Sequence, residues 1–150
     1  MSRRPWPIAL LASLLFTACA AGGARHAALG NRMGAALTGQ SEVPATNTSG
    51  RGTAVVDYDR ATRTVSWEVS WGGLSGPATA AHFHGPALPG QTAPVALSLT
   101  RAGTPPTSPA IGSAEIDEAK AADLLAGKWY LNIHTAANPN GEIRGQVMPK

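Results

Sequence analysis

Cysteine is almost absent from this sequence, since Cys19 is the single one among 150 residues. The chain after Cys19 therefore has no disulfide, and no thiolate there serves as a nucleophile or a metal ligand. Charged residues are also scarce, at 14 % against roughly 25 % in an average soluble domain. A domain of this composition has to be stabilised by its apolar core.

Clusters of basic residues are missing as well. The formal net charge of +3 includes Arg3 and Arg4. Without these two, ten Lys and Arg remain against nine Asp and Glu, and they are scattered singly along the chain. The sequence has no stripe of basic residues that could bind along a phosphate backbone, and it therefore argues against nucleic-acid binding.

The first residues have the pattern of an export signal. Arg3 and Arg4 precede an apolar run over residues 8–16, which is too short to span a bilayer. The segment Phe16-Thr17-Ala18-Cys19 resembles a bacterial lipobox, in which the cysteine is lipidated. We therefore expect a signal peptide over residues 1–18 and a lipid on Cys19. The alternative is an ordinary signal peptide cut near Ala20, with Cys19 lost.

Residues 19–32 are small and aperiodic, as is typical of a flexible tether. We interpret His26 as a solvated residue of this tether. Either form of export signal predicts an extracytoplasmic protein, and the lipobox predicts a cell-envelope protein held at a membrane by its lipid. Residues 33–150 would then form one folded domain.

Long helical runs are scarce, whereas Gly (17) and Pro (12) are numerous, which favours short strands joined by turns. The clearest strand is RTVSWEVSW, where Val65, Trp67, Val69 and Trp71 alternate with polar residues. Similar runs predict strands over 33–39, 52–58, 63–71, 77–85, 93–100, 111–116, 128–135 and 142–148. Residues 117–126 predict one short helix, with Asp117 as N-cap and Gly127 as its stop. The fold class is all-β: a Greek-key β-sandwich or barrel of about eight strands with one short helix.

Three histidines lie on the polar faces of two predicted strands. Alternation places His82 and His84 on one face of their strand, and His134 on the polar face of another. Neutral imidazole suits Cu(II) and Zn(II), so these residues are candidate ligands of one divalent ion. The alternative is that the three histidines are surface residues or form hydrogen bonds to loop backbone, without a metal. Both interpretations stay open, because sequence spacing does not show whether the two strands are neighbours.

Glu142 and Arg144 follow in the next strand, and alternation points both outward, beside His134 across a hairpin. They are candidate additional residues of the site, with Glu142 completing the metal shell or Arg144 steering an anion. An ordinary hairpin ion pair between them is the favoured interpretation, and it would contribute little energy.

Five segments resemble the CHRD (chordin-type) domain family: LTGQSEVP (37–44), the turn at 50–52, AHFHGPA (81–87), LLAGKWYLNIHT (124–135) and NPNGEIRGQV (138–147). They occur in family order. Phe83 stands where an aliphatic residue is usual, and Ala45 where a second proline is common. The resemblance implies an extracellular β-barrel or sandwich domain and no settled activity.

Three functions remain open on these residues. The first is a module that binds Cu or Zn. The second is a metalloenzyme on the same site, because the His-x-His strand is similar to the copper-ligand strand of copper/zinc superoxide dismutase, although a fourth histidine has no counterpart. The third is an adhesive domain that binds an extracytoplasmic protein partner without a metal.

Overall fold

The computed structural model describes residues 31–150. It contains β1 (Asn31–Thr38), η1 (Gly39–Ser41), β2 (Arg51–Asp59), β3 (Thr64–Gly72), β4 (Ala78–His84), β5 (Val95–Ser98), β6 (Ala110–Glu115), α1 (Glu118–Leu125), β7 (Trp129–Thr135) and β8 (Ile143–Pro149). Each predicted strand and the predicted helix is present within two residues of its expected ends. The all-β prediction is therefore confirmed.

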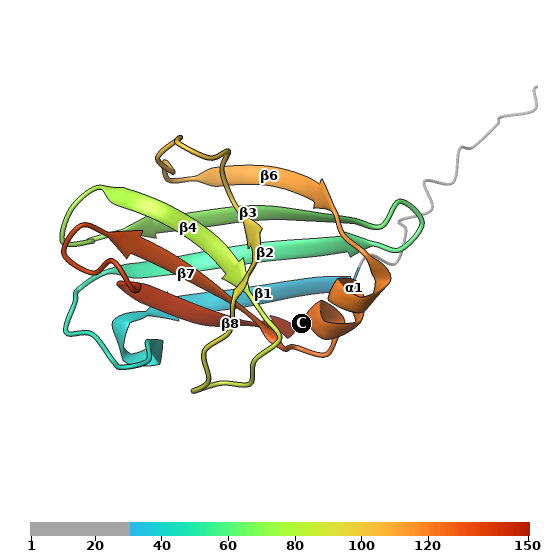
Figure 1. The fold of residues 1–150 in the computed structure, drawn as a ribbon, viewed down its shortest axis with the longest axis horizontal. Helices are drawn as coiled ribbons and strands as arrows, with labels where there is room; N and C mark the ends of the chain where they lie inside the picture. The colour runs from blue at the N-terminus through green and yellow to red at the C-terminus, as the bar shows by residue number, and fades with distance from the viewer. Residues whose placement is uncertain (1–30) are drawn as a thin grey trace, which may run out of the picture.

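All strands belong to one antiparallel sheet in the order β5-β4-β7-β8-β1-β2-β3-β6. The sheet curls, so that strands far apart in this order face each other (Figure 1). Trp67 of β3 packs edge-on against Phe83 of β4, with ring centroids 5.7 Å apart. This contact closes the sheet over a single core, as in a sandwich.

Alternation along the strands fills that core. On β3, Val65, Trp67 and Val69 are buried while Ser66 and Glu68 are exposed. Trp67 is thus a core residue, as its period-two pattern predicted, and Trp71 is only partly buried at the edge of the core. On the other half of the sheet the inward residues are large and fully buried, namely Phe83, Trp129, Leu131, Ile133, Ile143 and Val147.

Helix α1 covers one end of the sandwich (Figure 1). Its apolar face inserts Leu124 into the core. The Asp117 side chain accepts a hydrogen bond from the backbone N–H of Lys120 at 2.8 Å, as expected of an N-cap. Gly127 ends the helix with a φ of +70°, a conformation that glycine adopts without a Cβ clash.

Within the described residues, the buried core runs from Met33 to Val147. One folded domain over residues 33–150 stays a prediction. None of the helices in this part of the chain is long and apolar enough to cross a membrane.

Candidate metal centre

The two histidine-bearing strands are neighbours. Strand β4 pairs with β7 so that His82 lies opposite Asn132, and Ala80 lies opposite His134. His134 is therefore the diagonal neighbour of His82 on the same face. The small side chain of Ala80 lets the His134 ring lean across the strand pair. The pairing that sequence spacing left open brings all three histidines together.

The three rings form a compact group, called here the histidine triangle (His82, His84 and His134). Their centroids are 5.7 Å apart for His82–His84, 5.1 Å for His82–His134 and 6.1 Å for His84–His134. One nitrogen from each ring lies within 4.8 Å of the other two. The rings stand on the outer face of the sheet, where His82 and His84 are half-buried and His134 is 9 % exposed.

Backbone carbonyls fix two of the rings. His84 Nδ1 lies 3.0 Å from the Ala93 carbonyl, and His134 Nδ1 lies 3.0 Å from the Pro139 carbonyl. Because a carbonyl only accepts, each Nδ1 carries the proton and each Nε2 keeps its lone pair. His84 Nε2 is buried and has no hydrogen-bond partner among the described residues. Such outer bonds orient metal-binding imidazoles in proteins and leave the second nitrogen free to coordinate.

The rings are also held in the neutral form that coordination needs. Burial lowers the pKa of each of the three imidazoles below its ordinary value. Repulsion from His134 and His84 lowers the pKa of His82 further. Hydrogen bonds to Ala93 and Pro139 act in the opposite direction on His84 and His134, without reversing the shift. At neutral pH the triangle therefore presents uncharged nitrogens.

The spacing of these nitrogens suits a metal ion. His82 Nδ1 donates a hydrogen bond to His134 Nε2 over 3.2 Å, and a metal ion that binds both atoms would replace this proton. Two imidazole nitrogens bound to one ion at ~2.0–2.1 Å and near the tetrahedral angle would be ~3.4 Å apart. The His84 nitrogen lies within 4.8 Å of the other two ligand atoms, so it would have to approach them by up to ~1.4 Å to reach this spacing. Three imidazoles without sulfur fit Cu(II) or Zn(II) and leave at least one position for water or another ligand.

Tyr130 contacts both His84 and the backbone that orients it, and these contacts are called here the Tyr130 clamp. The ring of Tyr130 stacks on His84 with a centroid distance of 4.9 Å and an interplanar angle of 2°. The Tyr130 hydroxyl lies 3.2 Å from the Ala93 amide, which donates to it, and Ala93 in turn accepts from His84. The guanidinium carbon of Arg144 lies 3.4 Å above the other side of the Tyr130 ring. Tyr130 therefore sets both the plane of the His84 ring and the position of the carbonyl that orients it.

Arg144 does not occupy the place that alternation suggested. It is on the outer face of β8, yet it is only 2 % exposed and lies opposite Asn132 instead of His134. Its Nη2 donates to the Gln91 carbonyl at 2.6 Å. The loop after β4 thus covers it and turns an expected surface residue into a buried cation. Arg144 supports the triangle through Tyr130.

Glu142 was expected to point outward, and that expectation is wrong. Its side chain is fully buried and accepts hydrogen bonds from three loop residues and the last residue of β7. This set is called here the Glu142 hub: Thr48, Ser75, Asn138 and Thr135. The favoured ion pair with Arg144 is also wrong, because the ion pairs in residues 31–150 are Arg63–Glu115 and Lys128–Asp123. Glu142 holds three loops together and is outside the group of potential ligands.

Electrostatics distinguish this carboxylate from an ordinary buried acid. Burial raises the pKa of Glu142, but hydrogen bonds from Ser75, Thr135 and Thr48 outweigh it and bring the pKa to about 2. Both carboxylate oxygens are occupied by donors. A carboxylate so completely satisfied gains little from binding a metal.

A second buried acid, Glu42, was missed in the sequence. It accepts from Asn132 Nδ2 at 2.9 Å and is 7 % exposed. Burial raises its pKa to about 7, although the Arg144 charge and the Val43 backbone N–H lower it. Gly141 approaches both Glu42 and Asn132 so closely that a Cβ there would collide with them. The sequence did contain a signal for Glu42, because this acid lies within LTGQSEVP, a segment that resembles the CHRD family.

Two further candidates, Cys19 and His26, lie outside the described residues. The lipid attachment at Cys19 and the solvated role of His26 therefore stay predictions. Glu142 and Arg144, by contrast, are placed by the structure, and neither of them joins the group of three histidines.

Comparison with known proteins identifies a family for this chain. No curated protein and no solved structure matches the sequence significantly. A family model, described as the CHRD domain, matches residues 33–147. The match covers nearly the whole described region, including every strand that builds the triangle and the hub. The chain belongs to the CHRD domain family.

Proposed function

We propose that this chain is an exported, membrane-tethered CHRD-domain protein that binds one divalent metal ion, Cu(II) or Zn(II), through His82, His84 and His134. The metal would be held at the cell envelope for storage, delivery or sensing. Because the order of affinities for nitrogen ligands rises to Cu(II), copper should bind more tightly than zinc.

One observation carries the proposal. His84 Nε2 is a buried nitrogen with no hydrogen-bond partner in residues 31–150, and two further imidazole nitrogens lie within 4.8 Å of the ligand atom it offers. An unsatisfied buried polar atom is destabilising by ~1–3 kcal/mol unless another ligand completes it. The backbone contacts of His84 Nδ1 and His134 Nδ1 hold these two rings in place.

Calorimetric titration of the metal-free protein tests the proposal. One ion should bind per chain, and binding should raise the melting temperature because the unfolded chain has no assembled triangle. His134→Ala and His84→Ala should each weaken binding at least 100-fold, and His26→Ala should leave it unchanged. Binding no tighter than ~0.1 mM for both metals, or unaltered binding by His134→Ala, would leave the adhesive function in its place.

The membrane anchor requires its own test. Phe16-Thr17-Ala18-Cys19 supports a lipid on Cys19. Mass spectrometry of protein extracted from its native membrane should show a mature N-terminus at Cys19 that carries acyl chains. A free N-terminus at Ala20 or beyond would replace the anchor with secretion after ordinary signal cleavage.

A metalloenzyme on the same site is the second candidate, and one feature favours it. His82 lines a surface pocket of about 230 Å³ together with Thr100 and Arg101. A small molecule could therefore approach the triangle from the side of His82. Catalysis by the metal-loaded protein that disappears in His82→Ala, with the pocket intact, would support this function over storage.

A further inference from the structure

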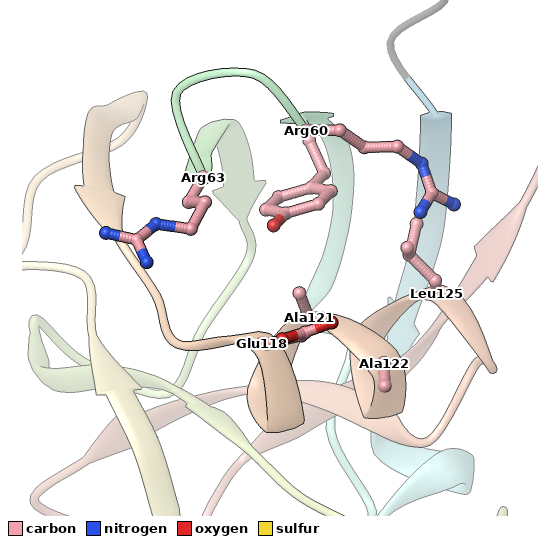
Figure 2. Close-up of a pocket in the computed structure, with 7 residues that line it drawn as sticks. Arg60, Arg63, Glu118, Ala121, Ala122 and Leu125 are labelled. Atoms are coloured by element: carbon pink, nitrogen blue, oxygen red, sulfur yellow. The ribbon is translucent and has the colours of Figure 1, made fainter.

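The end of the sandwich that α1 covers has a groove on the molecular surface, far along β7 from His134. Figure 2 shows one part of it, between the turn after β2 and the helix, with Arg60 and Arg63 at its rim. This part measures about 320 Å³. A second part of about 380 Å³ lies between the ends of β1 and β8. Arg60 and Leu125 line both parts, so the two parts are adjacent, and we treat them together as one groove.

The larger part of the groove has basic residues and some apolar surface. Arg32, Arg60 and Lys150 line this part, and none of them forms an ion pair with a residue in the range 31–150. The smaller part is less basic, because Arg63 is neutralised by Glu115 and the acid Glu118 also lines it. The accessible apolar surface of the larger part comes from Leu125 and Pro149.

One polar group in the groove also has no partner. Asn31 lines the larger part, and its Nδ2 is a buried donor without an acceptor among the described residues. Three unpaired cations, an amide donor and some apolar surface complement a ligand that carries a negative headgroup beside hydrocarbon. A phosphate group bonds well to such donors.

We infer that this groove binds the headgroup of an anionic phospholipid in the membrane that carries the protein. The inference rests on the proposed anchor at Cys19, which supplies the membrane at close range. Eleven residues separate Cys19 from Asn31, where β1 begins beside the groove. As a flexible chain they would span ~20 Å, and fully extended ~40 Å. The groove is thus within reach of the bilayer surface.

Because the protein would be tethered to the membrane, even a low affinity of the groove for the headgroup would be enough for binding. A short flexible linker holds the groove at an effective concentration in the millimolar range, so an interaction too weak for a soluble protein becomes occupied. Docking would also orient the domain. His134 lies five residues beyond Trp129 along β7, about 15–20 Å from the α1 end. The docked domain would turn His134 away from the membrane, while His84, which lies opposite Tyr130, stays nearer the α1 end.

Vesicle co-sedimentation tests the groove without the anchor. The protein used begins at Ala20, so that it lacks the lipid and keeps the whole domain. It should sediment with vesicles of equal parts phosphatidylcholine and phosphatidylglycerol, less so with added salt, and not with phosphatidylcholine alone. Arg60→Ala should lower the vesicle partition coefficient about fivefold, as one cation near an anionic surface would, and Arg60→Glu should lower it further.

Arg51→Ala is the matched control, because Arg51 is exposed but lines neither part of the groove. It should sediment as the unaltered protein does. Equal sedimentation with both vesicle types, no effect of Arg60→Glu, or an equal loss in Arg51→Ala would overturn the groove. Unchanged metal stoichiometry and melting temperature in each variant show that the fold is intact. Acylation at Cys19 is measured separately by mass, so failure of the groove and failure of the anchor give different results.

Discussion

Two polar clusters meet at the end of β7, and they differ in how completely their polar atoms are paired. Thr135 belongs to the Glu142 hub, where donors from several loops surround both carboxylate oxygens. His134, one residue earlier, belongs to the histidine triangle, where His84 Nε2 has no partner within residues 31–150. The protein itself satisfies the hub, whereas the triangle keeps one buried nitrogen without a partner in residues 31–150. The hub therefore stabilises the fold, and the proposed metal ion would complete the triangle.

The largest expected effect is on the hub. Glu142→Ala removes the acceptor of several buried donors, and should lower the free energy of unfolding by ~3–5 kcal/mol. Glu68→Ala is the control, because Glu68 is exposed on β3 and should change stability by less than ~0.5 kcal/mol. Denaturant unfolding at neutral pH measures both. Equal, small losses would mean that the hub contributes nothing beyond a surface carboxylate.

The same hub predicts an acid limb in stability. The Glu142 carboxyl has a pKa of about 2 in the folded protein against 4.5 as its ordinary value. Because the folded pKa is depressed, the stabilisation is fully present above about pH 4.5 and is lost as pH falls toward 2. Unfolding measured across this range should show a loss in the unaltered protein that is smaller in Glu142→Gln. Parallel profiles for the two proteins would contradict the assignment.

On the triangle, the Tyr130 clamp should matter for binding more than for folding. Tyr130→Phe keeps the ring that stacks on His84 but removes the hydroxyl that holds Ala93. We expect about a tenfold loss of metal affinity, at the lower end for groups that orient a ligand. Tyr58→Phe, a buried tyrosine near α1, is the control and should leave affinity unchanged. Equal affinities for all three proteins would show that the clamp does not position His84.

Glu42 should give the smallest effect, with the opposite sign to Glu142. Its pKa of about 7 in the folded protein lies above the ordinary 4.5, so its burial destabilises the fold as pH rises from 4.5 to 7. Glu42→Gln should therefore raise stability above pH 7 by roughly 1–2 kcal/mol and change little below pH 4.5. Thermal unfolding at the two pH values measures the difference. A variant that is less stable at pH 8 would show that the Glu42 charge is stabilised by Arg144.

The sequence predicted the framework more completely than the site. Period-two alternation identifies strands such as β3 because the inward and outward environments differ along the whole strand. The same alternation put His82 and His84 on one face. Alternation does not reveal which strands pair. The β4–β7 pairing joins segments about fifty residues apart, and it depends on the helix and turns between them.

Alternation also failed for Glu142 and Arg144, for an identifiable reason. It assigns a side chain to the outer face of a sheet, but it does not show whether a loop then covers that face. The Gln91 carbonyl of the loop after β4 covers Arg144, and the loops that contain Thr48 and Ser75 enclose Glu142. Glu42 was missed for the same reason, because it lies in a loop without periodicity and becomes buried only when that loop packs on β7.

Spectroscopy of the copper-loaded protein tests the central claim most directly. If the triangle binds the ion, pulsed electron paramagnetic resonance of the Cu(II) form should show three coordinated imidazoles. Each of His82→Ala, His84→Ala and His134→Ala should reduce that count to two, while Glu142→Gln should leave it at three. A count of three that survives His134→Ala, or a Cu(II) signal without imidazole nitrogen, would contradict the assignment of the triangle as the metal centre.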